Sequence, residues 1–356
     1  MNRYIPQLDG IRCLAVALVM FGHWTEHVPQ LARLDYVLAS SGVNLFFVLS
    51  GFLITGILLE AKSKAVEKGH AIRQFYIRRF LRIFPLYYGV LFVAVLAHAP
   101  GAREYFFSLV TYTANYPIAF RHGNYGYMTH LWSLAVEEQF YLIFPFVVLF
   151  VRKKYLKHIF ILAIAAAIIF RALCFLMIDN ETAGWMAYSF MPGCLDCLGL
   201  GALLAYYFRY DPRRIRMIIS NKIFIFSAVV IWITACIIGT QYKIVDAVGT
   251  RFFFALVCFW IIAKVSSPGF SGIAEQILSG RVFAFVGKIS YGIYVYHHFM
   301  PWIFERLHIH GASYLYLPTT ILIAYLSWQF FERPINDLKN KFTYEDTLQH
   351  RREITA

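Results

Sequence analysis

The stretch from Leu8 to His23, LDGIRCLAVALVMFGH, decides how this chain folds. It has the apolar composition of a membrane-spanning helix, yet it contains Asp9, Arg12 and His23. A charged side chain at the centre of a bilayer costs about 2.5–3.5 kcal/mol on insertion scales, so it faces protein or water and not lipid. At about 100° per residue, Arg12 and His23 share one helix face about 16 Å apart, and Asp9 lies one turn before Arg12. The stretch therefore predicts a helix with a single polar stripe. That stripe is either a functional passage or a buried Asp–Arg pair with one hydrogen-bonded histidine.

The composition of the whole chain agrees with a membrane location. Of its 356 residues, 59% are hydrophobic and 15% are charged, which predicts an all-α, polytopic membrane protein. The net charge is +13, but the basic residues lie in short loops between apolar runs. This is the pattern of the positive-inside rule, and it argues against nucleic acid as a partner. Cys194 and Cys197 have a metal-like spacing without a second ligand pair, so we expect buried thiols and no metal.

Ten apolar runs are predicted spans; several approach the roughly 20 residues that a helix needs to cross a bilayer, and the shorter ones are expected to tilt or to be flanked by interfacial aromatic residues. They lie at about 10–27, 37–59, 83–98, 131–151, 158–178, 187–208, 223–240, 248–263, 285–304 and 312–331. Most Lys and Arg residues then fall in segments on the side of the N-terminus, so both termini are predicted to be cytoplasmic. The run 104–120 is too polar for a span and is expected to be re-entrant or interfacial. Residues 1–334 form the predicted membrane module, and residues 335–356 form a cytoplasmic tail.

Three arginines, Arg78, Arg79 and Arg82, precede the third span. Arg79 and Arg82 are i,i+3 neighbours on an amphipathic helix at the inner membrane surface. Because guanidinium groups bind phosphate bidentately, this pair predicts a phosphate ligand. Attraction to anionic lipid headgroups is the alternative.

The fourth span opens with a second polar face, made by Ser133, Glu137 and Tyr141 at intervals of four residues. Glu137 is expected to face a wet cavity, whereas the adjacent Glu138 points about 100° away. The alternative is a helix end at which acidic residues are favoured by the helix dipole.

The ninth span carries a third polar stripe, made by Ser290, Tyr294 and His297, with Tyr291 beside it. Their i, i+4, i+7 spacing places the three on one helix face. An aromatic belt at the outer interface explains them equally well.

Taken together, these motifs resemble the membrane acyltransferase-3 family. The matching segments occur in the family's order along nearly the whole chain: LDGIR and His23, GVNLFFVLSGFLI (42–54), RRFLRIFPLYY (78–88), WSLAVEEQFY (132–141), SYGIYVYH (290–297) and FERP (331–334). The resemblance implies a ten-helix module that moves an acetyl or other acyl group from cytoplasmic acyl-CoA to a hydroxyl of a surface glycan. It assigns the family's Arg-x10-His motif to Arg12 and His23, and its Arg-x-x-Arg motif to Arg79 and Arg82. The Trp–Ser–Glu stretch of the family corresponds to Trp132, Ser133 and Glu137. The fused hydrolase-like domain of some members is expected to be absent.

The polar stripes and the resemblance together predict a mechanism. Acetyl-CoA, the expected co-substrate, places its phosphates on Arg78, Arg79 and Arg82 and its pantetheine arm past Arg12. One protein-lined passage brings the thioester to His23, which acts as general base on the acceptor hydroxyl. Direct transfer and a covalent acyl-histidine both remain open. Groups that support His23 or hold the sugar are Asp9, Arg12, Glu137, Trp132, Ser133, Tyr141, Tyr291, Tyr294 and His297.

Family frequency makes the O-antigen of lipopolysaccharide, free or lipid-linked, the expected acceptor, and a bacterial inner membrane the expected location. Membrane lipids are further expected partners, and a homo-oligomer is left open. A transporter with an intramembrane His/Arg/Glu relay is the leading alternative, because such residues also form proton pathways. A structural subunit of a glycan-assembly machine is a third candidate.

Overall fold

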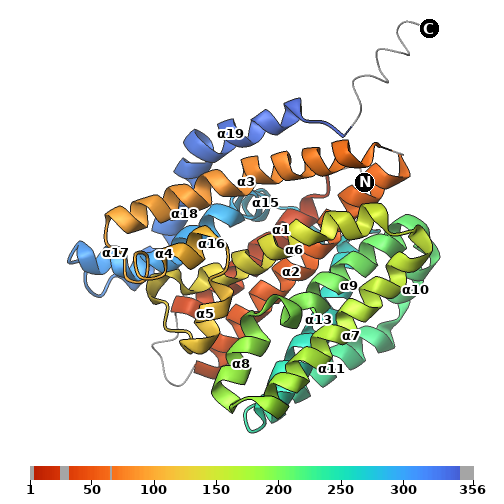
Figure 1. Ribbon diagram of the computed structural model, residues 1–356, viewed down its shortest axis with the longest axis horizontal. Coiled ribbons are helices and arrows are strands. Elements are labelled where there is room, and N and C mark those ends of the chain that lie inside the picture. Colours follow the sequence, from red (N-terminus) through yellow and green to blue (C-terminus); the bar gives the residue numbers. More distant parts are fainter. Residues whose placement is uncertain (1–3, 25–31, 65, 345–356) are drawn as a thin grey trace, which may run out of the picture.

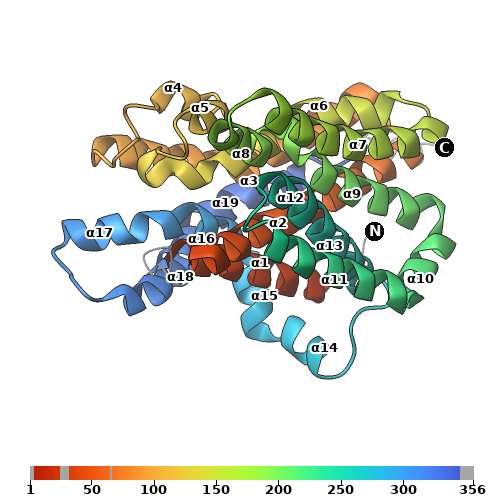
Figure 2. The same ribbon diagram turned by 90° about the horizontal axis from the view of Figure 1, so that it is seen from below.

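The computed structural model describes residues 4–24, 32–64 and 66–344, and every regular element in these ranges is helical (Figure 1). The polar first helix, α1 (Pro6–Trp24), lies in the middle of the molecule. It packs along α2 (Ala32–Ser63) and α15 (Arg281–Lys288) and also touches α16 (Ser290–Tyr296). Figure 2 shows α4 to α8 on one side of α1 and α2, with α14 (Ile273–Leu278) and α15 on the other. Asp9 is buried against these neighbours, whereas the apolar Leu14 and Phe21 are exposed on the other face of α1. The charged face is thus turned towards protein, as the cost of exposing Asp and Arg to lipid requires.

Small residues allow the central helices to approach closely. The most extensive contact joins α2 to α9 (Met191–Tyr210), and α9 also packs along α7 (Lys153–Met177). A Cβ atom added to Gly51 of α2 would lie 2.1 Å from the carbonyl oxygen of Leu198. A Cβ on Gly201 of α9 would lie 2.1 Å from the carbonyl oxygen of Val48. Both distances are clashes, so glycine is required at this crossing, as at many helix interfaces in membranes.

The remaining helices build the walls of the site and the outer shell. Apart from two short segments at the C-terminal end, within the described residues they are α3 (Lys68–Leu96), α4 (Phe106–Val110), α5 (Asn115–Phe120), η2 (Gly126–Leu131), α6 (Trp132–Phe150), α8 (Asn180–Ser189), α10 (Pro212–Ser220), α11 (Lys222–Ile238), α12 (Lys243–Val245), η3 (Asp246–Thr250), α13 (Arg251–Ser266), η4 (His297–Phe299), α17 (Met300–Arg306), η5 (Ser313–Leu315), α18 (Tyr316–Ser327) and η6 (Trp328–Glu332).

The helices confirm a multi-pass membrane protein. Among the described residues, six helices are long and apolar enough to cross a bilayer, and a seventh span arises if α10 and α11, bent by 64°, count as one. The described residues of all ten predicted runs fall mainly on helical segments, and residues 25–27 of the first run lie outside the described residues. The first run, 285–304 and 312–331 fall on shorter or less apolar helices. The count of ten spans and the cytoplasmic placement of both termini therefore stay predictions. The run 104–120 forms the short helices α4 and α5, which are too short to span.

The first part of the predicted tail is folded against the membrane module. Residues 333–341 form two short helical segments, α19 (Arg333–Asp337) and η7 (Leu338–Lys341), which pack on α3. The guanidinium of Arg78 donates to the carbonyl oxygens of Lys339 and Phe342, both at 2.9 Å. Residues 345–356 of the predicted tail lie outside the described residues.

Candidate active site

The polar stripe of α1 reaches two separate cavities. Near its first turn Arg12 donates to Asp9, and the hydroxyl of Tyr4 donates to the same carboxylate at 2.7 Å. The predicted Asp9–Arg12 pair is thus present. Arg12 lines one cavity, and His23, at the other end of the helix, lines a second. The polar stripe therefore lines open cavities at both ends and is not only a buried Asp–Arg pair.

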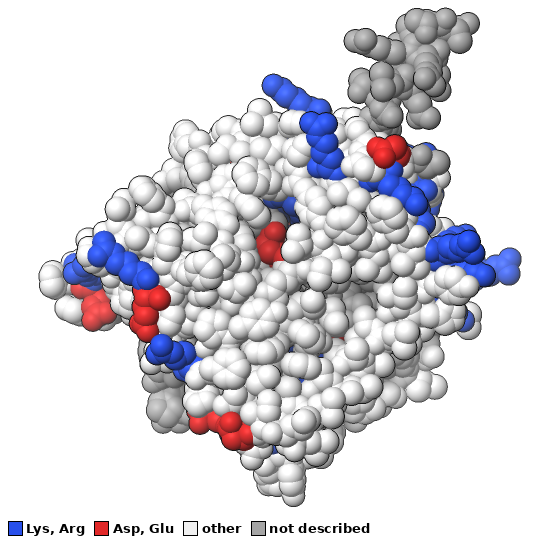
Figure 3. All heavy atoms as spheres, in the orientation of Figure 1, with Lys and Arg blue, Asp and Glu red and all other residues white. Residues whose placement is uncertain are grey.

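We call the first of these the arginine cavity; its volume is about 280 Å³. Its polar lining comes from α1, α2, α3, α6 and α16: Arg12, Ser50, Arg79, Arg82, Ser133, Glu137, Glu138, Tyr141, Ser290, Tyr291 and Tyr294. Figure 3 shows a hollow between α3 and α6 in which acidic and basic atoms lie together on an otherwise mostly uncharged face. Arg79 and Arg82 thus share one cavity, as their spacing predicts. Arg78 does not line it, because its guanidinium is bound to the carbonyl groups after α19.

The second polar face, on α6, also lies in the arginine cavity. The carboxylate of Glu137 accepts hydrogen bonds from Ser50 Oγ at 2.7 Å and from the Tyr141 hydroxyl at 2.9 Å. The guanidinium of Arg79 lies over the Tyr141 ring, 5.1 Å from its centroid. The expectation that Glu138 points away was wrong, because both glutamates line the cavity. The cavity extends far enough around α6 for side chains about 100° apart to reach it.

The second cavity, the histidine cavity, has a volume of about 1110 Å³. His23, His130 and His298 lie on its wall together with aromatic and amide groups. Among its other lining residues are Asp35, Tyr36, Ser40, Ser41, Asn44, Asn124, Trp132, Trp185, Tyr188, Trp232, Lys243, Asp246 and Arg251. A concave, largely aromatic site with a few convergent polar groups is typical of ligand binding. Only His23 and Trp132 of this lining were expected from the sequence.

Four histidines gather where α1, η2 and η4 meet. Nδ1 of His23 lies 2.8 Å from Nε2 of His297, and the two rings are nearly parallel. The His130 and His298 rings stack with centroids 4.8 Å apart, and His298 meets the His23 ring edge-on. His297 is fully buried behind His23. His130 was missed because it precedes the predicted polar face of α6, and its distance in sequence from His23 and His297 hides their proximity.

A thin layer of side chains separates the two cavities. The hydroxyl groups of Ser133 and Tyr294 are 2.5 Å apart, and Tyr294 also donates to the carbonyl oxygen of His130 at 2.8 Å. The ring of Phe46 packs against Tyr294. Among the residues that the structure describes, none lines both cavities. The single continuous passage expected from the sequence is therefore interrupted at this layer, because the tyrosine fills it and is held by two hydrogen bonds.

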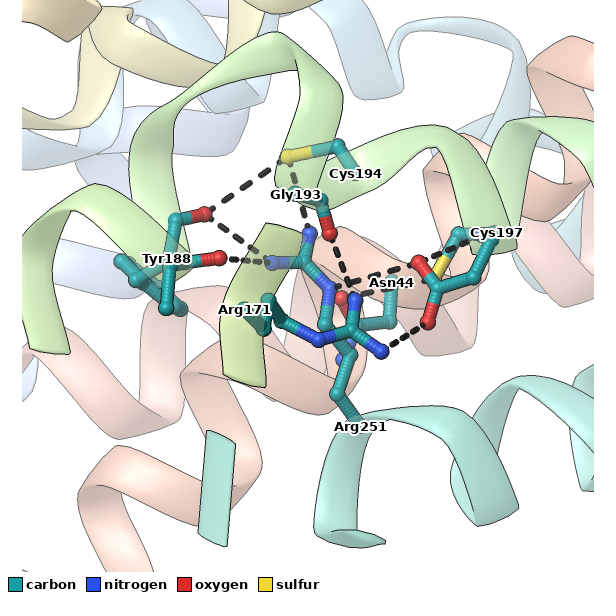
Figure 4. Close-up of polar contacts among 9 residues, drawn as sticks. Asn44, Arg171, Tyr188, Gly193, Cys194, Cys197 and Arg251 are labelled. Atoms are coloured by element: carbon teal, nitrogen blue, oxygen red, sulfur yellow. Dashed lines mark hydrogen bonds and ion pairs between the residues drawn. The ribbon is translucent and has the colours of Figure 1, made fainter. Parts of the chain in front are cut away.

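A second cluster of charges is buried inside the protein, and one of its members, Arg251, also lines the histidine cavity (Figure 4). Arg171 of α7 donates to Asp196 of α9 at 2.7 Å and to the carbonyl oxygen of Gly193 at 2.6 Å. Arg251 of α13 lies 4.0 Å from Asp196 and donates to the carbonyl oxygen of Tyr188 at 3.0 Å. We call Arg171, Asp196 and Arg251 the sealed cluster. No local motif in the sequence reveals this cluster, because its members lie on three different helices.

The cysteines near this cluster are buried thiols, as expected. Cys194 Sγ is 3.1 Å from a guanidinium nitrogen of Arg251, and Cys197 is also buried. In the part of the chain that the structure describes, no group of three or more His, Cys, Asp or Glu residues has the geometry of a metal site.

Comparison with known proteins places this architecture in a family. The peptidoglycan O-acetyltransferase OatA of Listeria monocytogenes is 29% identical over 96% of this chain. A Staphylococcus aureus (strain COL) protein named as an O-acetyltransferase is 29% identical over 93% of the chain. The chain spans 57% of the length of each of these relatives. No solved structure matches the chain. The family model described as "Acyltransferase domain" matches residues 5–331, so the chain belongs to this membrane acyltransferase family.

Proposed function

We propose that this protein is an integral membrane O-acetyltransferase that moves an acetyl group from cytoplasmic acetyl-CoA to a hydroxyl of a surface glycan. Membership of the acyltransferase family and the names of the relatives support the reaction class. The observation that carries the proposal is the pairing of an arginine-lined cavity with a histidine-lined cavity across one layer of side chains. Such a pair holds two substrates on opposite sides of a reacting centre.

The arginine cavity is the proposed donor site. Arg79 and Arg82 supply two guanidinium groups for the phosphates of acetyl-CoA, and Arg12 supplies a third deeper in the cavity. A volume of about 280 Å³ is small for a ligand cavity, so we assign it the pantetheine arm and leave the adenosine at the mouth. Arg82 is exposed, which suits a contact with phosphate at the mouth. Arg78 is better assigned to holding the segment after α19 against α3.

The histidine cavity is the proposed acceptor site. Its volume and its tryptophans suit a sugar chain, whose ring faces are apolar and whose hydroxyls bond to Asp35, Asn44 and similar groups. This assignment changes the roles expected from the sequence. Ser133 and Tyr294 belong to the separating layer, and Tyr141 and Tyr291 belong to the donor side. Trp132 keeps its place on the acceptor side.

His23 is the proposed general base. In direct transfer its ring nitrogen removes the proton of the acceptor hydroxyl while the oxygen attacks the thioester carbonyl carbon. The C–S bond then breaks, and the leaving CoA thiolate takes the proton back from the imidazolium. The products are the acetyl ester and CoA thiol. Transfer through an acetyl-histidine uses the same residue, and either route requires the Ser133–Tyr294 layer to open for the thioester.

The acceptor and the location are part of the proposal. The bacterial inner membrane and the O-antigen remain predictions, whereas the Listeria relative carries peptidoglycan in its name. The test compares cells that lack the gene with cells that carry the wild-type, His23→Ala or His23→Gln protein. Ester-linked acetate is measured separately on O-antigen and on peptidoglycan. We expect the gene to restore acetate on one glycan and both variants to fail at equal membrane abundance. Normal acetylation by the variants would refute the role of His23.

A transporter predicts a different result with the same protein. Purified enzyme should release free CoA from acetyl-CoA when lipopolysaccharide or soluble peptidoglycan fragments are added. A transporter would bind or move a solute without cleaving the thioester. Absence of CoA release with both glycans, from protein that binds acetyl-CoA, would count against the proposed reaction.

A further inference from the structure

The contact between His23 and His297 determines which ring nitrogen of each histidine carries a proton. His23 lies at the end of α1, whereas His297 begins η4 and is fully buried. The indole nitrogen of Trp24 donates to the backbone carbonyl oxygen of His297 at 3.2 Å, which ties the same two segments together. The ring nitrogens that face each other, Nδ1 of His23 and Nε2 of His297, are 2.8 Å apart. One of these two nitrogens must donate a proton and the other must accept it.

The other nitrogen of His297 decides which one donates. Its Nδ1 lies 2.6 Å from the backbone carbonyl oxygen of Tyr294. A carbonyl oxygen only accepts, so Nδ1 of His297 carries the proton, and a neutral imidazole has only one. Nε2 of His297 is then an unprotonated acceptor. Nδ1 of His23 must therefore be the donor in the hydrogen bond between the two rings.

The same reasoning assigns the remaining nitrogen of His23. Because the single proton of its neutral ring is on Nδ1, Nε2 of His23 carries a free lone pair. Within the described residues, no other hydrogen bond to the His23 ring is present, and the residue is partly exposed on the histidine cavity. His130 and His298 do not compete, because each is bonded to a backbone carbonyl oxygen instead, that of Val295 and that of Tyr127, both at 3.2 Å.

We infer that His297 is a positioning residue that holds His23 in the tautomer whose unprotonated Nε2 faces the acceptor. This inference rests on the proposed function, in which His23 is the base. His297 acts as the aspartate does in a Ser-His-Asp triad, by orienting the imidazole and fixing its tautomer, but it does so as a neutral group. When His23 gains the acceptor proton, its Nδ1–H continues to donate to His297, so the orientation survives the proton transfer.

Three substitutions of His297 separate this role from a packing role. In His297→Gln the side-chain oxygen can reach the position of Nε2 and accept from His23. In His297→Asn the shorter amide can still donate to Tyr294 but no longer reaches His23. His297→Phe keeps the ring volume and removes both bonds. Initial rates of CoA thiol release are measured on protein in nanodiscs, with acetyl-CoA and either lipopolysaccharide or soluble peptidoglycan fragments as the probes. Thermal midpoints check that each variant is folded.

We expect the Gln variant to keep most of the wild-type kcat, and the Asn and Phe variants to lose at least tenfold. The loss is limited by the ~10²–10⁴-fold effect of a general base, which His23→Ala measures directly. KM for acetyl-CoA should stay unchanged, because His297 does not line the donor cavity. An Asn variant as fast as wild type, or a folded Gln variant as slow as Asn, would overturn the inference while His23→Ala remains inactive. A fully active His23→Ala protein would overturn the proposed function and this inference together.

Discussion

Two groups of charged side chains lie among the apolar helices, and they differ in their access to water. In the arginine cavity, Arg12 keeps 22% of its side chain exposed and Arg82 is exposed. In the sealed cluster, the side chains of Arg171 and Asp196 are completely buried. A charged side chain is costly inside a membrane, and the two groups avoid that cost in different ways. The arginine cavity is open to water, whereas the charges of the sealed cluster are paired with each other inside the protein. A charged residue in a membrane-spanning region therefore indicates a polar environment. That environment can bind a ligand only where water and ligands can reach it.

The sealed cluster joins three helices that are distant in sequence. Arg171, Asp196 and Arg251 come from α7, α9 and α13. Arg171 also donates to the carbonyl oxygen of Gly193, and Arg251 to that of Tyr188. Two cations surround one carboxylate, so removing that carboxylate leaves two buried positive charges facing each other. In the arginine cavity, Arg12, Arg79 and Arg82 share an open space with Glu137 and Glu138, and Arg12 also donates to Asp9. We therefore expect substitutions in the sealed cluster to change protein stability, and substitutions in the arginine cavity to change ligand binding.

The largest effect on stability should come from Asp196→Asn. Loss of the carboxylate leaves the completely buried Arg171 uncompensated, together with Arg251, whose side chain is 7% exposed. Removal of one partner of a buried ion pair costs about 3–5 kcal/mol. Thermal unfolding in detergent is the measurement. A midpoint equal to that of wild type would show that water enters the cluster, and the distinction between the two groups would fail.

Arg79→Met should produce the opposite pattern. Its guanidinium lines the open cavity, so we expect the unfolding midpoint to change little. Loss of a charge-assisted hydrogen bond to phosphate, about 1.5–3 kcal/mol, should weaken acetyl-CoA binding by about 10- to 150-fold. Isothermal titration calorimetry with acetyl-CoA measures this change. Unchanged affinity for acetyl-CoA in both Arg79→Met and Arg82→Met would show that these arginines do not bind its phosphates. Arg78→Met, outside the cavity, serves as the control.

Tyr294→Phe tests the layer between the cavities. The substitution keeps the ring and removes the hydrogen bonds to Ser133 Oγ and to the His130 carbonyl oxygen. We expect a cost of about 0.5–1.5 kcal/mol per bond in stability, together with faster hydrolysis of acetyl-CoA without a glycan, because water reaches the thioester more easily. Hydrolysis at the wild-type rate would mean that this hydroxyl does not keep the cavities apart.

The smallest effect should come from Glu138→Gln, the matched partner of Asp196→Asn. One carboxylate oxygen of Glu138 has no hydrogen-bond partner among the described residues, and the side chain lines the open cavity. Replacing it with a neutral amide of the same shape should shift stability by less than about 1 kcal/mol. The same thermal scan that reports Asp196→Asn measures it. A loss as large as that of Asp196→Asn would show that the arginine cavity is as dry as the sealed cluster.

Local spacing predicted the parts of the site that lie on one helix. Arg79 and Arg82 line one cavity, Glu137 bonds to Tyr141 there, and Arg12 pairs with Asp9, because residues three or four apart lie on one side of a helix. Glu138 was misjudged because helix periodicity says where a side chain points and not how far a cavity extends. The hydrogen bonds of Arg78 could not be predicted from local spacing, because the segment that accepts them lies far along the chain, after α19.

The sequence by itself determined that the chain is a helical membrane protein and that its first helix carries a polar face inward. These properties follow from composition and from the helical period of 3.6 residues. Both can be determined from residues that are close together in the sequence. Only the tertiary structure decided that the polar face opens into two cavities, that His297 meets His23, and that Asp196 is sealed between two arginines. Such contacts join helices far apart in the chain, and the packing of those helices selects which side chains meet and which meet water.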